Sequence, residues 1–302
     1  MRPQLKRSIV VVGIAVVIVT LWSGTRSAVV GQSPATYKAP RTADGQPDLN
    51  GFWQTLNTAN WDLEEHGAQP APFQNLVGAY LAQPAGFSVV EGGEIPYKPE
   101  ALAKKKKYFE NRLNPDALLL ENGFQDFSDP EAKCFRGGVP RSTYLPYPFQ
   151  IIQGQNKIFI GYEYNSPSDR VIYLGDDLDK TRATLADNDT WNGQSVGKWE
   201  GETLVVDVRW FSHDIWLDRA GNFYSPKAVV VERYTPTAPS HLQYEATITD
   251  PDTFTRPWKI SMPLYRRIDP NMQLLEFQCI PFADEFVYGP LYKNPIKKQW
   301  PK

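Results

Sequence analysis

The sequence predicts a mainly β protein whose strands form an antiparallel barrel or a two-sheet sandwich. Aromatic residues make up 13% of the 302 residues, with nine Trp, which favours a sheet-rich core or an aromatic-lined cavity over a helical bundle. From Phe149 onward, short apolar runs alternate with well-marked turns. No helix-length stretch separates these runs, so antiparallel pairing is expected rather than a doubly wound parallel sheet.

The first 31 residues predict an export signal. Arg2, Lys6 and Arg7 form a positive start, and the apolar run Ile9–Trp22 follows. That run fits the apolar region of a signal peptide but is shorter than the roughly 18 residues that a spanning helix needs. We expect cleavage after Gly31 and a periplasmic or extracellular protein, with no membrane contact after cleavage. The alternative is an uncleaved anchor.

Residues 32–133 are expected to be an extended Pro/Gly-rich segment that packs on a β domain of residues 134–302. Within this segment, Gly51-Phe52-Trp53 follows a turn signal and reads as the start of a strand. Pro99 suits the first turn of a helix, and good helix formers continue to Arg112. A second short helix is expected to begin at Asp129.

Eight further strands are expected, each bounded by turn residues. They are Phe149–Gln153, Lys157–Tyr164, Arg170–Leu174, Glu202–Val208, Ala228–Tyr234, Leu242–Thr249, Trp258–Arg267 and Leu274–Cys279. Eight to ten strands of this kind must close into a barrel or stack as a sandwich.

Only two cysteines occur, Cys134 and Cys279. In an oxidising compartment we expect them to form a disulfide, worth about 4–5 kcal/mol in the chain-entropy model because the closed loop is long. The alternative is two buried free thiols. Together with three scattered His they make no zinc pattern. The formal net charge of −2 leaves no basic field for phosphates, so nucleic-acid binding is not expected.

Six stretches of the chain form a recognisable set. They are Ala43–Trp53 (ADGQPDLNGFW), Asp129–Cys134 (DPEAKC), Lys198–Asp207 (KWEGETLVVD), Trp216–Phe223 (WLDRAGNF), Val231–Tyr234 (VERY) and Phe254–Tyr265 (FTRPWKISMPLY). Together they resemble a large family of exported bacterial proteins of unknown function. The resemblance implies no reaction. Relatives often carry His where this chain has Tyr224 and Val229, so a catalytic His at either place would be missing here.

A second resemblance is architectural. Gly51-Phe52-Trp53 is a G-x-W on the first expected strand, as lipocalin-like barrels have. Combined with an antiparallel strand order and an export signal, it favours a lipocalin-like barrel over a sandwich.

Strand alternation indicates where a site could lie. Glu163, Asp207, Glu232, Arg233 and Arg256 are charges embedded in apolar runs, and a charge inside a barrel is costly unless it is paired. One interpretation is a polar cluster at the floor of a cavity, with Glu232 as acid or base and Arg256 orienting an anion. The other is that these charges face solvent or pair across strands.

The best single candidate for a functional loop is Trp216–Asn222, which mixes Trp, Asp and Arg beside a Gly turn. In the alternative interpretation, Asp218 only caps local N–H groups. Aromatic rings line sites for flat ligands but more often fill a core. The candidate catalytic residues are therefore Glu232, Asp218 and Tyr244, and the candidate ligand-binding residues are Arg256, Arg233, Trp216, Trp191 and Trp258.

Two motifs carry little weight. Gly193–Gly197 matches G-x-S-x-G, but its flanks are not the strand and helix of a hydrolase. Asp187–Gly193 begins like a calcium loop, yet Gly falls one place late and Lys198 stands where Glu is needed. No nicotinamide, P-loop, haem or iron–sulfur signature occurs, so no cofactor and no metal is expected.

Three functions remain open. The first is an exported β-barrel that encloses a small apolar or aromatic molecule. The second is a cofactor-free hydrolase, lyase or isomerase with carboxylate acid/base residues in the barrel. The third is a structural or interaction protein of the envelope.

Overall fold

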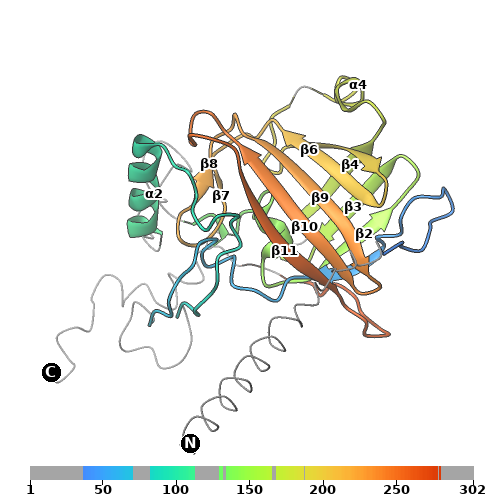
Figure 1. The fold of residues 1–302 in the computed structure, drawn as a ribbon, viewed down its shortest axis with the longest axis horizontal. Helices are drawn as coiled ribbons and strands as arrows, with labels where there is room; N and C mark the ends of the chain where they lie inside the picture. Colours follow the sequence, from blue (N-terminus) through green and yellow to red (C-terminus); the bar gives the residue numbers. More distant parts are fainter. Residues whose placement is uncertain are drawn as a thin grey trace, which may run out of the picture. The chain divides into compact units, whose positions relative to one another are not determined.

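A computed structural model describes residues 37–70, 82–112, 129–131, 134–164, 168–186, 188–277 and 279. These residues form a closed barrel of nine strands with a few short helices, so the expected mainly β fold is confirmed (Figure 1). Among the helices described, none is long and apolar enough to cross a membrane.

Around the barrel the strand order is β1-β11-β10-β9-β6-β5-β4-β3-β2. The strands are β1 (Gly51–Gln54), β2 (Phe149–Gln153), β3 (Lys157–Tyr162), β4 (Ser168–Leu174), β5 (Gln194–Glu200), β6 (Thr203–Arg209), β9 (Val229–Ala238), β10 (His241–Thr249) and β11 (Trp258–Arg266). A small hairpin of β7 (Ile215–Trp216) and β8 (Phe223–Tyr224) stands apart from the barrel. The helices are α2 (Pro99–Asn111), α3 (Arg141–Tyr144) and α4 (Leu178–Arg182).

The strand β1 closes the barrel. Trp53 pairs with Arg266 of β11 on one side and with Phe149 of β2 on the other, both antiparallel. Because the ring of hydrogen bonds is complete, no barrel strand presents a free edge. This closing strand comes from the N-terminal Pro/Gly-rich segment rather than from the strand-rich half of the chain.

One pair of strands departs from the expected antiparallel order. β4 and β5 run parallel, with Ile172 opposite Ser195. Parallel neighbours need a crossover connection, and here residues 175–193, which contain α4, bring the chain back to the same end. Asp177 begins this helix by accepting a hydrogen bond from the backbone N–H of Lys180. Antiparallel pairing was expected here, and this parallel pair was not anticipated because the polar five-residue helix in the connection has no apolar periodicity.

The last expected strand is also absent. Leu274–Phe277 form no strand pairing. The backbone N–H of Leu275 instead donates to a carboxylate oxygen of Glu163 at 2.9 Å, and Phe277 packs between the rings of Tyr147 and Tyr164. Cys279 then forms the predicted disulfide with Cys134. Residues 267–279, which we call the C-terminal strap, therefore fasten to the barrel through side chains and one covalent bond.

Alternation of side chains places the core inside the barrel. On β10 the residues alternate strictly between buried and half-buried or exposed, and the buried ones are Leu242, Tyr244, Ala246 and Ile248. This is the period of two that the sequence predicted. Most of the buried apolar side chains form one continuous cluster inside the barrel.

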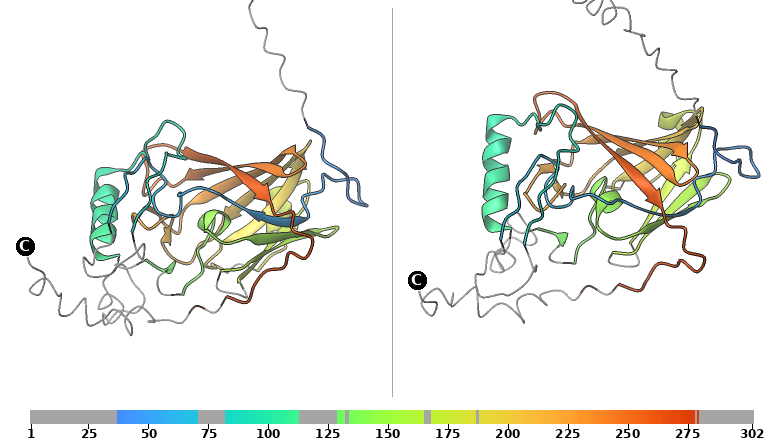
Figure 2. Two further views of the ribbon diagram at one scale, coloured as in Figure 1. Left: turned by 90° about the horizontal axis from the view of Figure 1, so that it is seen from below. Right: turned by 60° about the horizontal axis from the view of Figure 1, so that its bottom comes forward.

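The two ends of the barrel are covered by different parts of the chain. At one end lie α2 and the β7–β8 hairpin, where Tyr108 stacks on Trp216 with ring centroids 4.7 Å apart. At the other end residues 37–50, which we call the N-terminal segment, lie against the β9–β10 hairpin. Figure 2 shows these two coverings from two further sides.

A glycine of the G-x-W is required by a close approach of the last strand. Gly51 has φ +133°, a conformation that L side chains rarely adopt, and a Cβ there would lie 2.4 Å from Nη1 of Arg266. The Arg266 guanidinium in turn lies over the ring of Trp53, 4.3 Å from its centroid. A side chain at position 51 would therefore strain the backbone and displace the Arg266 guanidinium.

We predict that Gly51→Ala lowers the free energy of unfolding by about 1–3 kcal/mol, because the alanine strains the backbone and the Arg266 side chain must move aside. Gly45→Ala is the matched control, since Gly45 also has positive φ but open space around it. Equilibrium denaturation by guanidinium chloride measures both. Equal losses in the two variants would contradict the steric role of Arg266.

Candidate functional site

A buried ion pair lies inside the barrel. Glu232 of β9 and Arg170 of β4 form a bidentate pair, with Nη1 3.2 Å from Oε1 and Nη2 against Oε2. The hydroxyls of Tyr234 and Tyr244 donate to the same Oε1 at 3.0 and 2.7 Å. Nε of Arg170 donates to the hydroxyl of Ser195 at 2.9 Å. Strand alternation left open which face of this strand is interior, and in the structure the face of Glu232 points inward, where Glu232 meets Tyr244.

No space remains beside this pair. Glu232, Tyr234 and Tyr244 are 0% exposed and Arg170 is 3% exposed, whereas a group lining a water-filled cavity would keep accessible surface. The Glu232 carboxylate already accepts four hydrogen bonds, which is about its full capacity. The cluster is therefore packed core, and the expectation that it forms the floor of a cavity is not met.

The protonation states follow from burial and charge. Burial raises the pKa of the Tyr244 hydroxyl well above its ordinary value, and the negative charge of Glu232 raises it further. Tyr244 therefore stays protonated and keeps donating. Burial lowers the pKa of the Arg170 guanidinium, but the charge of Glu232 outweighs this, so the net shift is upward. Arg170 therefore stays charged.

We predict that Glu232→Gln lowers the free energy of unfolding by about 3–5 kcal/mol, because it leaves Arg170 charged and buried without a counter-charge. Denaturation of Glu200→Gln provides the control, since Glu200 pairs at 3.0 Å with the neighbouring Arg233 on the exposed face of the barrel. That loss should stay below about 1 kcal/mol.

Adding Arg170→Met to Glu232→Gln should recover part of the stability, because the unpaired cation is removed. If Glu232→Gln and Glu200→Gln lowered the free energy of unfolding equally, burial of the Glu232–Arg170 pair would not add to its effect on stability.

A second polar cluster lies beyond the barrel, beside the β7–β8 hairpin. Asp218 is 0% exposed and accepts hydrogen bonds from the backbone N–H of Leu63 and of Asn222, both at 3.0 Å. The side-chain amide of Asn222 bridges Asp218 at 2.6 Å and Asp62 at 3.2 Å. Asp218 therefore caps N–H groups and fastens the loop Trp216–Asn222 to the N-terminal half. It makes no contact with Glu232, so the three candidate catalytic residues do not form one site.

Asp218 titrates near neutrality. Burial raises its pKa to about 7, and the charge of Asp62 adds to the effect. Burial also raises the pKa values of Asp62 and Glu64, while Lys105 and His66 oppose the rise at Asp62. A carboxyl whose pKa is higher in the folded than in the unfolded state stabilises the fold while it is protonated, and that contribution is lost as the pH rises.

We therefore predict that stability falls by up to about 1.4 kcal/mol per pH unit between pH 5 and 7, and levels off above the pKa of Asp218. Guanidinium denaturation at several pH values measures this slope. Asp218→Asn should be less stable at every pH, because an amide cannot accept all three N–H donors, but its slope should be shallower. Asp252→Asn, at an exposed position, is the control. If the free energy of unfolding of Asp218→Asn changed with pH as steeply as that of the unaltered protein, groups other than Asp218 would cause the pH dependence.

A third cluster secures the segment before α3. Arg141 is 1% exposed and binds Asp129 with both terminal nitrogens, at 2.7 and 2.8 Å. It also donates to Glu131 at 2.7 Å and to Asn60 at 3.0 Å. Burial would raise the pKa of Glu131, but Arg141 and Arg219 lower it to about 2. This network is saturated and offers no free group to a ligand.

The predicted ligand-binding arginines lie outside the barrel. Arg233 points outward and pairs with Glu200. Arg256 is exposed and donates to the carbonyl of Pro257 at 3.2 Å. Neither approaches Glu232, because the alternation that buries Glu232 turns its neighbour Arg233 to the other face, and Arg256 precedes β11 in a loop. The arginine that pairs with Glu232 is Arg170, which sequence analysis did not select.

The predicted ligand-binding tryptophans are also separated. Trp216 packs beside α2, as described above. Trp191 stacks on Phe135, with ring centroids 5.2 Å apart and an interplanar angle of 11°. Trp258 lies inside the end of the barrel against Phe254, and its ring N–H makes no hydrogen bond within the described chain. These rings fill separate parts of the core and do not line a common cavity.

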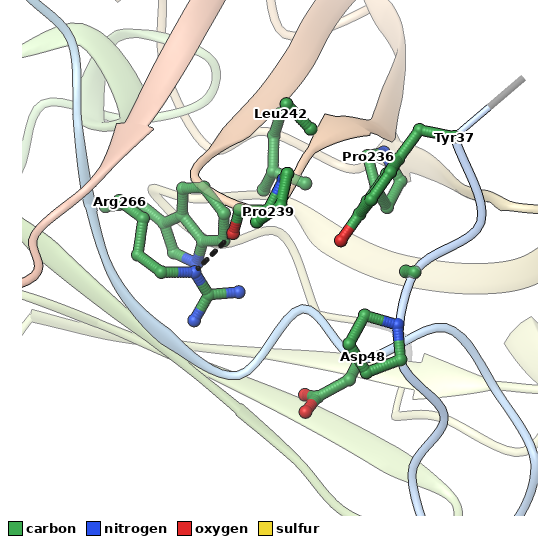
Figure 3. Close-up of a pocket in the computed structure, with 10 residues that line it drawn as sticks. Tyr37, Asp48, Pro236, Pro239, Leu242 and Arg266 are labelled. Carbon is green, nitrogen blue, oxygen red and sulfur yellow. Dashed lines mark hydrogen bonds between the residues drawn. The ribbon is translucent and has the colours of Figure 1, made fainter. Parts of the chain in front are cut away.

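A cavity of about 270 Å³ opens where the N-terminal segment meets the β9–β10 hairpin. It is lined by Tyr37, Ala39, Pro40, Asp48, Trp53, Pro236, Ala238, Pro239, Leu242 and Arg266. The walls are mostly apolar, and the side chains of Tyr37, Asp48 and Arg266 point into the space from different sides (Figure 3). A mostly apolar pocket with a few convergent polar groups is the usual form of a small-molecule site.

The polar groups of this cavity are held by other contacts yet keep unused atoms. Nε and Nη1 of Arg266 donate to the carbonyls of Pro239 and Asn50, which leaves Nη2 without a hydrogen bond within the described chain. Oδ1 of Asp48 accepts from Asn50, and Oδ2 accepts from no described residue. Burial lowers the pKa of Arg266, and the charge of Asp48 opposes that shift.

Sequence reasoning missed this cavity, although one signal pointed toward it. Trp53 of the G-x-W was noted as an architectural feature, but Tyr37 and Asp48 lie in a stretch read as irregular chain. Compared with known proteins, the chain matches no family model, no curated protein and no solved structure. Within the described residues, no group of three or more His, Cys, Asp or Glu side chains could hold a metal ion.

Proposed function

We propose that this protein is an exported binding protein, built on a lipocalin-like plan, that takes a small apolar or aromatic molecule at the rim of its barrel. The observation that carries the proposal is the 270 Å³ cavity with apolar walls and unused polar atoms on Arg266 and Asp48. The disulfide is compatible with an oxidising compartment outside the cytoplasm.

Binding is favoured over catalysis by the placement of the carboxylates. A cofactor-free enzyme of the expected kind needs two of its candidate acid/base groups within reach of one pocket. Glu232 is enclosed by its hydrogen-bond donors and Asp218 belongs to a separate cluster. At the rim, in contrast, unused polar atoms and apolar walls occur together, which suits recognition of a ligand without chemistry on it.

The rim also suits a ligand because its walls come from separate parts of the chain. The N-terminal segment supplies Tyr37 and Asp48, the β9–β10 hairpin supplies Pro236 and Pro239, and β11 supplies Arg266. A ligand that contacts all three would hold them together and so stabilise the folded state by mass action.

We predict that Ala238→Phe abolishes ligand binding by filling the cavity while leaving the barrel folded. Native mass spectrometry of the protein purified from its host should show a retained small molecule, and thermal denaturation should show a higher midpoint with that ligand than without it. A ligand at one hundred times its dissociation constant stabilises by about 2.7 kcal/mol. In Ala238→Phe both signals should disappear.

Thr237→Phe is the matched control, because Thr237 is the exposed neighbour on the same hairpin and does not line the cavity. It should bind as the unaltered protein does. Retention of the ligand by Ala238→Phe would show that the molecule binds elsewhere, and loss in both variants would point to damage of the hairpin.

A further inference from the structure

We propose that the rim cavity selects a zwitterion: a free α-amino acid with an apolar side chain, its carboxylate on Arg266 and its ammonium group on Asp48. This inference rests on the proposed binding function and names the ligand class for that site. It follows from the way the two opposite charges are held.

Arg266 and Asp48 line the same cavity but form no ion pair with each other. Each is fixed by a different partner: Arg266 by the carbonyls of Pro239 and Asn50, and Asp48 by the backbone and side-chain N–H groups of Asn50 at 2.9 and 2.8 Å. Asn50 therefore acts as a spacer that contacts both charges. They cannot collapse onto each other without breaking these bonds.

The spacing leaves one donor and one acceptor for a ligand. Nη2 of Arg266 offers an N–H to a carboxylate, and such charge-assisted bonds are about twice as strong as neutral ones. Oδ2 of Asp48 offers an acceptor to an ammonium group. The hydroxyl of Tyr37, which has no hydrogen-bond partner in the described chain, points into the same space and can take a remaining N–H or carboxylate oxygen (Figure 3).

The walls and the volume limit the rest of the ligand. Pro40, Ala238 and Pro239 keep accessible apolar surface in this cavity and add no further charge. The volume of about 270 Å³ lies just below the roughly 300–1,000 Å³ of pockets for drug-sized ligands, which suits a smaller molecule such as an amino acid.

Charge balance explains why a ligand with only one charge should bind less well. A carboxylic acid without an amine places its anion on Arg266 but leaves Asp48 partly desolvated and unpaired. An amine without a carboxylate places its cation on Asp48 but leaves Arg266 partly desolvated and unpaired. An unpaired, desolvated charge costs free energy, so the cavity rejects both half-ligands relative to the zwitterion.

The test compares four probes on the purified protein by isothermal titration calorimetry at pH 7: phenylalanine, leucine, 3-phenylpropionate and phenethylamine. We expect one of the two amino acids to bind at least tenfold more tightly than either single-charge probe. Asp48→Asn should weaken amino-acid binding about tenfold or more and should strengthen 3-phenylpropionate binding, because the amide keeps the Asn50 hydrogen bonds through Oδ1 and leaves no unpaired negative charge.

Asp44→Asn is the matched control, since Asp44 is an exposed acid of the same segment that does not line the cavity. Its affinities should not change. Neutral indole is an additional probe. A site for any small aromatic molecule should bind it, whereas a site selective for a zwitterion should bind it weakly. If indole or 3-phenylpropionate bound as tightly as the amino acids, and Ala238→Phe removed that binding, the zwitterion would be wrong while the rim would remain a binding site. If no probe bound and no small molecule were retained, both proposals would fall.

Discussion

The structure depends on closure of the barrel by the four-residue strand β1, Gly51–Gln54. β1 completes the ring between β2 and β11, and without it two strands would present unpaired edges. Closure excludes water from the interior, where Arg170 and Glu232 are tolerated because each nitrogen of the guanidinium and both carboxylate oxygens make hydrogen bonds. The same strand also fixes the N-terminal segment against the β9–β10 hairpin, so the seam that seals the core also places the walls of the rim cavity.

Under the proposed binding function, the packing around the Arg170–Glu232 pair leaves recognition of a ligand to the rim of the barrel. A buried Arg–Glu pair contributes little net stability compared with apolar packing, but losing one member is costly. Such a pair therefore fixes which side chains meet inside more than it strengthens the fold. With Tyr234, Tyr244 and Ser195 bound to the pair, the interior has no room for a ligand. The rim, where three separate parts of the chain meet, keeps polar atoms that no protein group uses.

Sequence patterns predicted the features that neighbouring residues determine, such as strands and the alternation of their side chains. The period of two showed which residues of β10 and of β9 share a face, but not which face is interior; the structure buries Tyr244 and Glu232. Patterns failed where distant residues decide the outcome. Nothing near Glu232 names Arg170 as its partner, because the two strands meet only through the barrel. β5 was missed because Ser195 faces inward to satisfy Arg170 instead of filling an apolar position. The cavity was missed because Asp48 lies in chain without a repeating pattern.

The disulfide between Cys134 and Cys279 divides the barrel unequally. Every barrel strand except β1 lies between these two cysteines, so eight strands belong to a covalent ring and β1 belongs to the tail that leads into it, as in a lasso. In the described chain the tail is held by hydrogen bonds, packing and the Arg41–Glu202 ion pair, without a covalent link to the ring other than the chain itself. Peeling away residues 37–54 would open the seam and the rim cavity in one movement, while the ring keeps the remaining strands from separating.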